Sequence, residues 1–132
     1  MLLEKHCWAE VSLDALRENF RLVQAAAGNT PVMAVVKANA YGHGDAAVAR
    51  LLEAEGAAAF AVSDLAEALC LRRAQVARPI LILGWTDPAC TAALAVNTVT
   101  QAAVSLQHAK ALSYAALHAG VTLNVHLKVD TG

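Results

Sequence analysis

One lysine ends an apolar segment that starts at Pro31 and reads PVMAVVK. We expect this segment to form a strand with Lys37 at its carboxyl end, where removal from water disfavours the charged ammonium. A neutral amine is the form that attacks an aldehyde and closes a Schiff base. Pyridoxal 5'-phosphate (PLP) carries an aldehyde and a phosphate, so Lys37 is a candidate for covalent attachment of this cofactor.

The residues that follow Lys37 are suited to a phosphate group. Tyr41 offers a hydroxyl, and Gly42 and Gly44 allow close approach of the backbone. A helix is expected to begin near Asp45, and helix N-termini attract anions, although this acidic side chain would repel a phosphate placed directly on it. By spacing alone the pattern is weak, because a lysine at a strand end commonly extends into water and YGHG is also a common turn sequence.

Strands and helices are expected to alternate along the chain. Ser12 is a candidate N-cap of the first helix, and Gly28 ends its 3.6-residue apolar pattern. Asp64 with Glu67 has the form of a capping box before the third helix. The expected helices cover residues 13–27, 45–55, 64–74, 87–96 and 105–119, and the expected strands cover residues 8–11, 32–36, 57–63, 79–84, 97–101 and 121–130.

This alternation predicts an α/β fold with a parallel sheet whose strands are apolar on both faces. In the last strand Asn124, His126, Lys128 and Asp130 alternate with apolar residues, which places polar groups on one face, as at the mouth of a barrel. A (β/α)₈ barrel needs ~250 residues, whereas the chain has 132. We therefore expect residues 1–132 to be the N-terminal part of a TIM-type (β/α)₈ barrel, ending after about the fifth strand, within a longer protein.

Composition excludes several classes of protein. The chain has 10 Lys and Arg residues against 11 Asp and Glu, a formal net charge of -1, which provides no basic surface for nucleic acid. No apolar stretch approaches the ~20 residues of a membrane span and the N-terminus lacks the apolar core of a signal peptide, so we expect a cytoplasmic protein with no membrane partner. Cys7, Cys70 and Cys90 are widely spaced and are expected to be free thiols that bind no metal.

Three segments resemble the alanine racemase family. Residues 34–44, AVVKANAYGHG, are similar to its PLP-attachment signature, residues 8–20, WAEVSLDALRENF, to its N-terminal entry, and residues 126–132, HLKVDTG, to a second motif. The resemblance runs over essentially the whole chain and covers about the first third of a family member. It implies an enzyme that interconverts L- and D-alanine and so supplies D-alanine for cell-wall peptidoglycan.

The resemblance also implies roles for single residues. Lys37 would hold PLP and serve as the base on the D-substrate side of the α-carbon, and Tyr41 would bind the phosphate. Lys128 matches a position that is carbamylated in many members, where it would orient an arginine beyond Gly132. The opposite base would be a tyrosine from the C-terminal β domain of a partner subunit. The full-length protein is therefore expected to be a homodimer, and this chain alone is expected to be inactive.

Other functions stay open on the sequence alone. The substrate of such a racemase could be serine or another small amino acid, because the groups that select it lie largely downstream. A non-catalytic PLP-binding barrel protein concerned with cofactor handling shares the strand-end lysine. Related barrel decarboxylases share it too, but they generally lack the NAYGHG continuation. A plain phosphate- or nucleotide-binding domain is disfavoured, because neither G-x-x-x-x-G-K-[ST] nor G-x-G-x-x-G is present.

Overall fold

The computed structural model describes residues 7–132, so residues 1–6 of the expected domain lie outside it. Five parallel strands form one sheet: β1 (Met33–Val35), β2 (Ala59–Val62), β3 (Ile80–Ile82), β4 (Val99–Ala103) and β5 (Val125–Leu127). Each strand pairs with the next one in sequence, so the order across the sheet is β1-β2-β3-β4-β5. The predicted α/β fold with a parallel sheet is confirmed, and β1 and β5 form its two edges.

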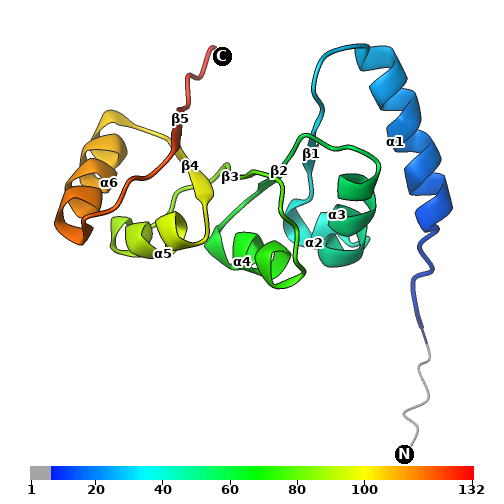
Figure 1. Ribbon diagram of the computed structural model, residues 1–132, viewed down its shortest axis with the longest axis horizontal. Helices are drawn as coiled ribbons and strands as arrows, with labels where there is room; N and C mark the ends of the chain where they lie inside the picture. The colour runs from blue at the N-terminus through cyan, green and yellow to red at the C-terminus, as the bar shows by residue number, and fades with distance from the viewer. Residues whose placement is uncertain (1–6) are drawn as a thin grey trace, which may run out of the picture.

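The helices that connect the strands lie on one face of the sheet (Figure 1). They are a short turn α2 (Lys37–Tyr41), α3 (Asp45–Ala54), α4 (Leu65–Arg73), a 3₁₀ turn η1 (Pro88–Cys90), α5 (Thr91–Val96) and α6 (Leu106–Ala119). The helix α1 (Leu13–Ala27) precedes β1 and lies beside α3. The predicted N-caps are confirmed, because Ser12 accepts from the Ala15 N–H and Asp64 from the Glu67 N–H. None of the helices in residues 7–132 is long and apolar enough to cross a membrane.

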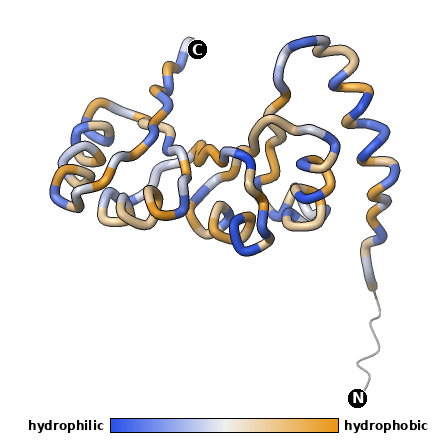
Figure 2. Tube along the Cα trace, viewed as in Figure 1, coloured by the Kyte–Doolittle hydropathy of each residue, from blue (hydrophilic) through white to orange (hydrophobic). Residues whose placement is uncertain are grey.

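The hydrophobic core lies between these helices and the adjacent face of the sheet. Phe60 of β2 and Ile80 and Ile82 of β3 are completely removed from solvent, as are Leu71 of α4 and Leu94 of α5. Figure 2 shows hydrophobic segments along the middle strands and alternating hydrophobic and hydrophilic residues along α1. A buried side chain of this size contributes about 1.5–3 kcal/mol, so this face holds the strands in place.

The opposite face of the sheet carries no helix from the described part of the chain, and its apolar side chains are partly exposed (Figure 1). Met33 and Val35 of β1 are 40% and 43% exposed, and all three residues of β5 are exposed. The expected burial on both faces is therefore correct for β3 and wrong for β1, and in β5 the apolar Val125 and Leu127 are exposed as well as the polar His126. These two are edge strands, each with a neighbouring strand on one side only.

The strands predicted at 32–36, 57–63 and 79–84 are present but one or two residues shorter at each end, and the other three predicted strands differ more. Residues 8–11 form no strand, and residues 7–132 offer no neighbouring strand to satisfy their backbone groups. The strand predicted at 97–101 begins at Val99, because Asn97 still belongs to the end of α5, where its amide donates to the Ala93 carbonyl at 2.8 Å. The last strand, predicted at 121–130, is limited to Val125–Leu127.

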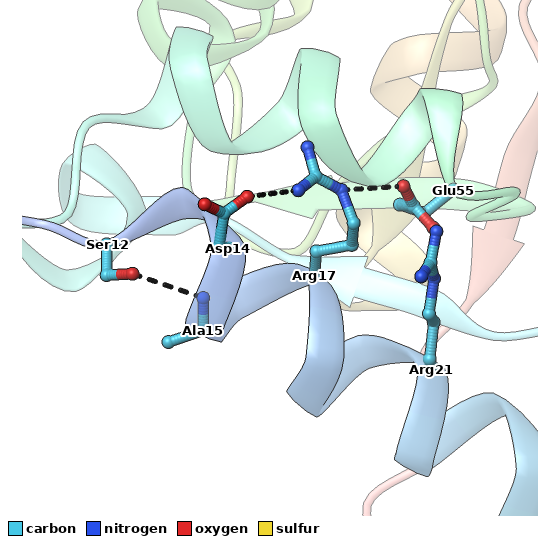
Figure 3. A network of polar contacts seen from close by, with 6 residues as sticks. All are labelled: Ser12, Asp14, Ala15, Arg17, Arg21 and Glu55. Carbon is cyan, nitrogen blue, oxygen red and sulfur yellow. Dashed lines mark hydrogen bonds and ion pairs between the residues drawn. The ribbon is translucent and has the colours of Figure 1, made fainter.

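Ion pairs hold α1 against α3 (Figure 3). Arg17 Nε donates to Glu55 Oε1 at 2.9 Å and Arg21 Nε donates to Glu55 Oε2 at 2.7 Å, so one carboxylate just after α3 binds two guanidinium groups of α1. Arg17 also pairs with Asp14. The hydrogen bond from Arg21 is the main cause that lowers the pKa of Glu55 below its usual value, and Arg17 adds to the effect.

We predict that the attachment of α1 weakens in acid. A carboxyl group whose pKa is lowered on folding adds stability above its unfolded pKa of about 4.3, and this stability is lost as the pH falls through the folded value. Glu55→Gln should therefore reduce the free energy of unfolding at neutral pH and have a smaller effect below about pH 4. Urea unfolding of wild type and variant across this pH range measures the difference.

The control for this experiment is Glu18→Gln. Glu18 is an exposed α1 residue outside the Arg17–Glu55–Arg21 network, so its variant should follow the wild-type pH profile. Parallel profiles for the wild type and Glu55→Gln would contradict a role of Glu55 in holding α1.

Candidate active site

Lys37 lies at the C-terminal end of β1. The preceding residue, Val36, is 2% exposed in the core and its N–H donates to the Ala61 carbonyl at 2.9 Å, which anchors the backbone next to the lysine. Lys37 itself is half-buried rather than buried. Within residues 7–132 its amine has no carboxylate within 4.0 Å, so no ion pair in this part of the chain must break before the amine reacts.

The backbone after Lys37 forms a left-handed helical turn. Ala38, Asn39, Ala40 and Tyr41 all have φ between +51° and +54°, although none of them is glycine. For a residue with a Cβ this conformation costs roughly 1–2 kcal/mol. Such strain gathers at functional sites and persists where the surroundings over-determine the backbone. Sequence rules reserve positive φ for glycine, so this turn was not predicted.

Local hydrogen bonds hold the far end of the turn. Asn39 Oδ1 accepts from the Asp45 N–H at 3.0 Å, and the Asn39 carbonyl accepts from the Gly44 N–H at 2.9 Å. His43 donates both its backbone N–H and its Nδ1–H to the Ala40 carbonyl, at 3.1 Å and 2.9 Å. Because the N–H groups of residues 43–45 are used in this way, the start of α3 offers an anion fewer donors than the sequence suggested.

Tyr41 keeps its hydroxyl available. Its side chain is 60% exposed, and the hydroxyl makes no hydrogen bond within the described residues 7–132. An added Cβ at Gly42 or Gly44 would meet nothing within 4 Å, so the space beside the turn is open. A half-buried amine and a phenol donor next to open space fit the aldehyde and the phosphate of PLP, the pair of groups expected from the sequence.

A second set of contacts joins the ends of β1, β2 and β3. Glu67 of α4 accepts from the Ala38 N–H through Oε1 and from the Ser63 N–H through Oε2, both at 2.7 Å. The Ser63 carbonyl accepts from the Gly84 N–H at 3.1 Å, and a Cβ at Gly84 would lie only 2.5 Å from that oxygen.

These strand-end contacts correct one expectation from the sequence. The capping box forms only in part, because Asp64 caps the Glu67 N–H while the Glu67 carboxylate binds Ala38 and Ser63. Ala38 and Glu67 are 29 residues apart, so no local pattern could have indicated their contact.

Lys128 follows β5 at the opposite edge of the sheet. Its N–H donates to the Ala103 carbonyl at 3.1 Å, and it lines a shallow cavity with His126 next to Leu81 and Leu83. Lys37 and Lys128 thus lie at the same end of the sheet. Three strands separate β1 from β5, so the two lysines lie on the two edge strands of the described sheet.

Buried polar side chains fix the loop after β3. Gln101 is fully buried and its Nε2 donates to the Gly84 carbonyl at 2.6 Å. His108 is 4% exposed, donates through Nε2 to the Thr86 carbonyl at 2.9 Å, and lies against the ring of Trp85. The sequence indicated His108 only as a surface or packing residue, and it did not indicate the buried role of Gln101. Across residues 7–132, no three His, Cys, Asp or Glu side chains are grouped so that they could hold a metal ion.

Comparison with known proteins gives consistent results. A sequence model described as "Alanine racemase, N-terminal domain" matches residues 11–132. The curated alanine racemase of Desulfovibrio desulfuricans is 42% identical over 130 residues, which are 98% of this chain and 35% of the relative. A solved alanine racemase of Clostridium difficile 630 has a TM-score of 0.91 at 35% identity, over 99% of this chain and 35% of that chain.

A solved histidine racemase from Leuconostoc mesenteroides subsp. sake has a TM-score of 0.86 at 36% identity, over 92% of this chain and 33% of its own. The chain therefore spans about a third of the length of the relatives it matches. The five strands and their helices correspond to the first part of the racemase barrel, which confirms the expected TIM-type fold class.

We predict that Gly84→Ala disturbs the strand-end contacts. The new methyl group would press on the Ser63 carbonyl, and overpacking of this kind costs about 1–3 kcal/mol. The Ser63 N–H, which Glu67 binds, should then exchange with solvent faster. Hydrogen exchange followed by mass spectrometry or NMR measures this rate together with the unfolding midpoint.

Gly120→Ala is the control for this variant. Gly120 has φ +65° and open space around it, so an alanine there costs a similar ~1–2 kcal/mol of backbone strain at the end of α6. It should leave the exchange of the Ser63 N–H unchanged. Equal exchange at Ser63 in both variants would show that the fit at Gly84 has no local effect.

Proposed function

The chain belongs to the alanine racemase family, and on this premise we propose that it forms the N-terminal, cofactor-binding part of a PLP-dependent amino-acid racemase. Residues 1–132 would be the N-terminal portion of the PLP-binding barrel domain, in keeping with the third of its relatives' length that the chain spans. The rest of the barrel and a C-terminal β domain would be contributed by sequence outside this chain.

The observation that carries the proposal is the strained left-handed turn directly after Lys37. A turn of four such residues is costly to keep, and it fixes the backbone positions from which the Lys37 and Tyr41 side chains extend. A lysine with no role beyond solubility would need no such backbone, because its flexible side chain reaches water from any strand end.

Lys37 and Tyr41 would bind opposite ends of the cofactor. Bound PLP supplies an aldehyde for Lys37 and an electron sink that makes the α-proton of an amino acid removable. Lys37 Nζ, once the amino group of the substrate has displaced it from the cofactor, would remove or return that proton on the D-substrate face of the α-carbon. Tyr41 donates its hydroxyl hydrogen to a phosphate oxygen and so holds the other end of the cofactor.

Inversion of the α-carbon also requires an acid–base group on its other face. We propose a tyrosine of the partner subunit for this role, which makes the active protein a homodimer. Lys128 would carry a carbamate, formed when its neutral amine adds CO₂ and loses a proton. This change replaces a cation by an anion, which would orient an arginine beyond Gly132 toward the cofactor.

The proposed substrate is alanine, and the proposed cellular role is the supply of D-alanine for peptidoglycan in the cytoplasm. The relatives named alanine racemase support this assignment. The similarity to a protein named histidine racemase, at 36% identity, supports testing other amino acids as well. Racemisation assays with L-alanine, L-serine and L-histidine on the protein at its natural length would decide among these substrates. A protein that binds PLP and racemises none of them would instead be a cofactor-handling barrel protein.

We predict that Lys37 is the residue that binds PLP covalently. Borohydride reduction of the PLP-loaded protein should fix the cofactor on the peptide that contains Lys37, as read by mass spectrometry. Lys37→Ala should abolish this label and lower racemisation at least about 10³-fold, since it removes the attachment point and one base.

Lys110→Ala provides the matched control. Lys110 is exposed on α6, so its variant should keep the label at Lys37 and the activity of the wild type. A label on any other residue, or none at all, would overturn the proposed function.

We predict that Tyr41→Phe weakens cofactor binding more than it slows the chemistry. It deletes one hydrogen bond to a charged phosphate, worth about 1.5–3 kcal/mol, so the Kd for PLP should rise at least about tenfold. Tyr114→Phe is the control, because Tyr114 is an exposed α6 residue that stacks on His118. Fluorescence titration of the cofactor-free proteins measures the Kd. Equal affinity in the two variants would remove Tyr41 from the phosphate site.

A further inference from the structure

The left-handed turn after Lys37 needs an anchor at each end. Its far end is held locally, through Asn39 and His43, to the loop that leads into α3. At its near end the local bonds use carbonyl groups, because Val36 O accepts from the Ala40 N–H at 3.0 Å and Ala38 O accepts from the Gly42 N–H at 3.1 Å. The Ala38 N–H has no local partner in the described residues, and here the chain leaves β1 and enters positive φ. The group that binds the Ala38 N–H therefore decides where the turn begins relative to the sheet.

That group is the carboxylate of Glu67. Its two oxygens accept one backbone N–H each, from Ala38 and from Ser63, both at 2.7 Å. Ser63 lies directly after β2, the neighbour of β1 in the sheet. We call the Glu67 carboxylate with these two N–H groups the Glu67 clamp. It ties the first residue of the strained turn to the end of the adjacent strand.

The position of the Glu67 carboxylate is fixed by the packing of α4. Glu67 lies in the first turn of α4, and its own N–H is capped by Asp64 Oδ1 at 3.0 Å. The neighbouring residues Ala68 and Leu71 are fully buried in the core, which fixes the helix. The Glu67 side chain is half-buried, and within residues 7–132 it has no Lys or Arg partner within 4.0 Å. In the described chain its charge is therefore directed at backbone N–H donors, and such charge-assisted bonds are among the strongest in proteins.

We propose that Glu67 is a positioning residue for Lys37. It acts through Ala38, the next residue along the backbone, and sets the direction in which the lysine amine leaves β1. The inference rests on the proposed function, because it assigns to Glu67 the placement of the amine that would carry PLP. Glu67 touches neither cofactor nor substrate in this role.

The chain contains a matched control for this role. Glu53 of α3 also binds two backbone N–H groups, those of Ala77 and Arg78, each at 2.8 Å. These residues precede β3, so this contact lies at the opposite end of the sheet from Lys37. Both Glu53 contacts use Oε1, whereas the Glu67 contacts use one oxygen each. Glu53→Gln and Glu67→Gln therefore remove the same charge from a carboxylate that binds two backbone N–H groups, and only the second change is next to the turn.

The test compares wild type, Glu67→Gln and Glu53→Gln at the natural length of the protein. A glutamine keeps one acceptor oxygen, but its NH₂ group is a donor and cannot accept from the second N–H, so one of the two hydrogen bonds of the clamp is lost. In Glu67→Gln we expect the Ala38 N–H to exchange at least about 30-fold faster in the cofactor-free protein. In the loaded protein we expect kcat to fall at least about tenfold with KM changed less than about threefold. Glu53→Gln should leave all three quantities within about twofold of wild type.

Glu67→Asp is the second variant, for use if Glu67→Gln does not fold. Aspartate retains the charge but is one methylene shorter, so it cannot span both N–H groups, and it should shift exchange and kcat in the same direction. Unchanged Ala38 exchange and kcat in the Glu67 variants, or equal changes in the Glu53 variant, would overturn the inference.

The outcomes also separate the inference from the proposed function. If borohydride labels Lys37 in every protein while the exchange rate of the Ala38 N–H stays constant, only the positioning role of Glu67 is refuted, and the proposed function stands. If wild type is not labelled at Lys37, the proposed function fails, and the positioning role fails with it.

Discussion

The left-handed backbone of residues 38–41 is the constraint on which the arrangement of the site depends. On one side Val36 is fixed by burial in the core and by its bond to Ala61, and on the other side Gly42 leaves the turn with φ +88°. Four residues with a Cβ do not stay in this conformation by preference. The contacts of Asn39, His43 and Glu67 compensate for the strain, so the direction of Lys37 is a property of several elements together.

The two faces of the sheet serve different purposes. The face under the helices carries the large buried side chains, such as Phe60 and Ile82, and supplies the stability. The other face presents Val35 of β1 and His126 of β5 to solvent, with a lysine at the end of each of these edge strands. This division leaves the candidate site free of the packing demands of the core, and polar side chains can lie there at low cost.

Local signals in the sequence predicted most of the fold, and the sequence singled out Lys37 and Tyr41 as candidates. The caps at Ser12 and Asp64 form as expected, and the parallel α/β order follows from the alternation of apolar patterns. The turn geometry was not predictable, because Ala38 and Ala40 carry no signal for positive φ. The role of Glu67 was not predictable either, because its contact with Ala38 exists only after α4 has packed beside α2, the turn that follows β1.

The strands follow one another across the sheet in the same order as in the sequence, and this order has a consequence for folding during synthesis. Residues paired on neighbouring strands are close in sequence, from 19 positions for Ile80 and Val99 to 26 for Met33 and Ala59. A nascent chain can therefore add one strand at a time to the growing edge as it leaves the ribosome, without waiting for a distant partner. Each added strand pairs with the exposed edge of the one before, so during synthesis one unpaired edge belongs to the newest strand and the other stays with β1.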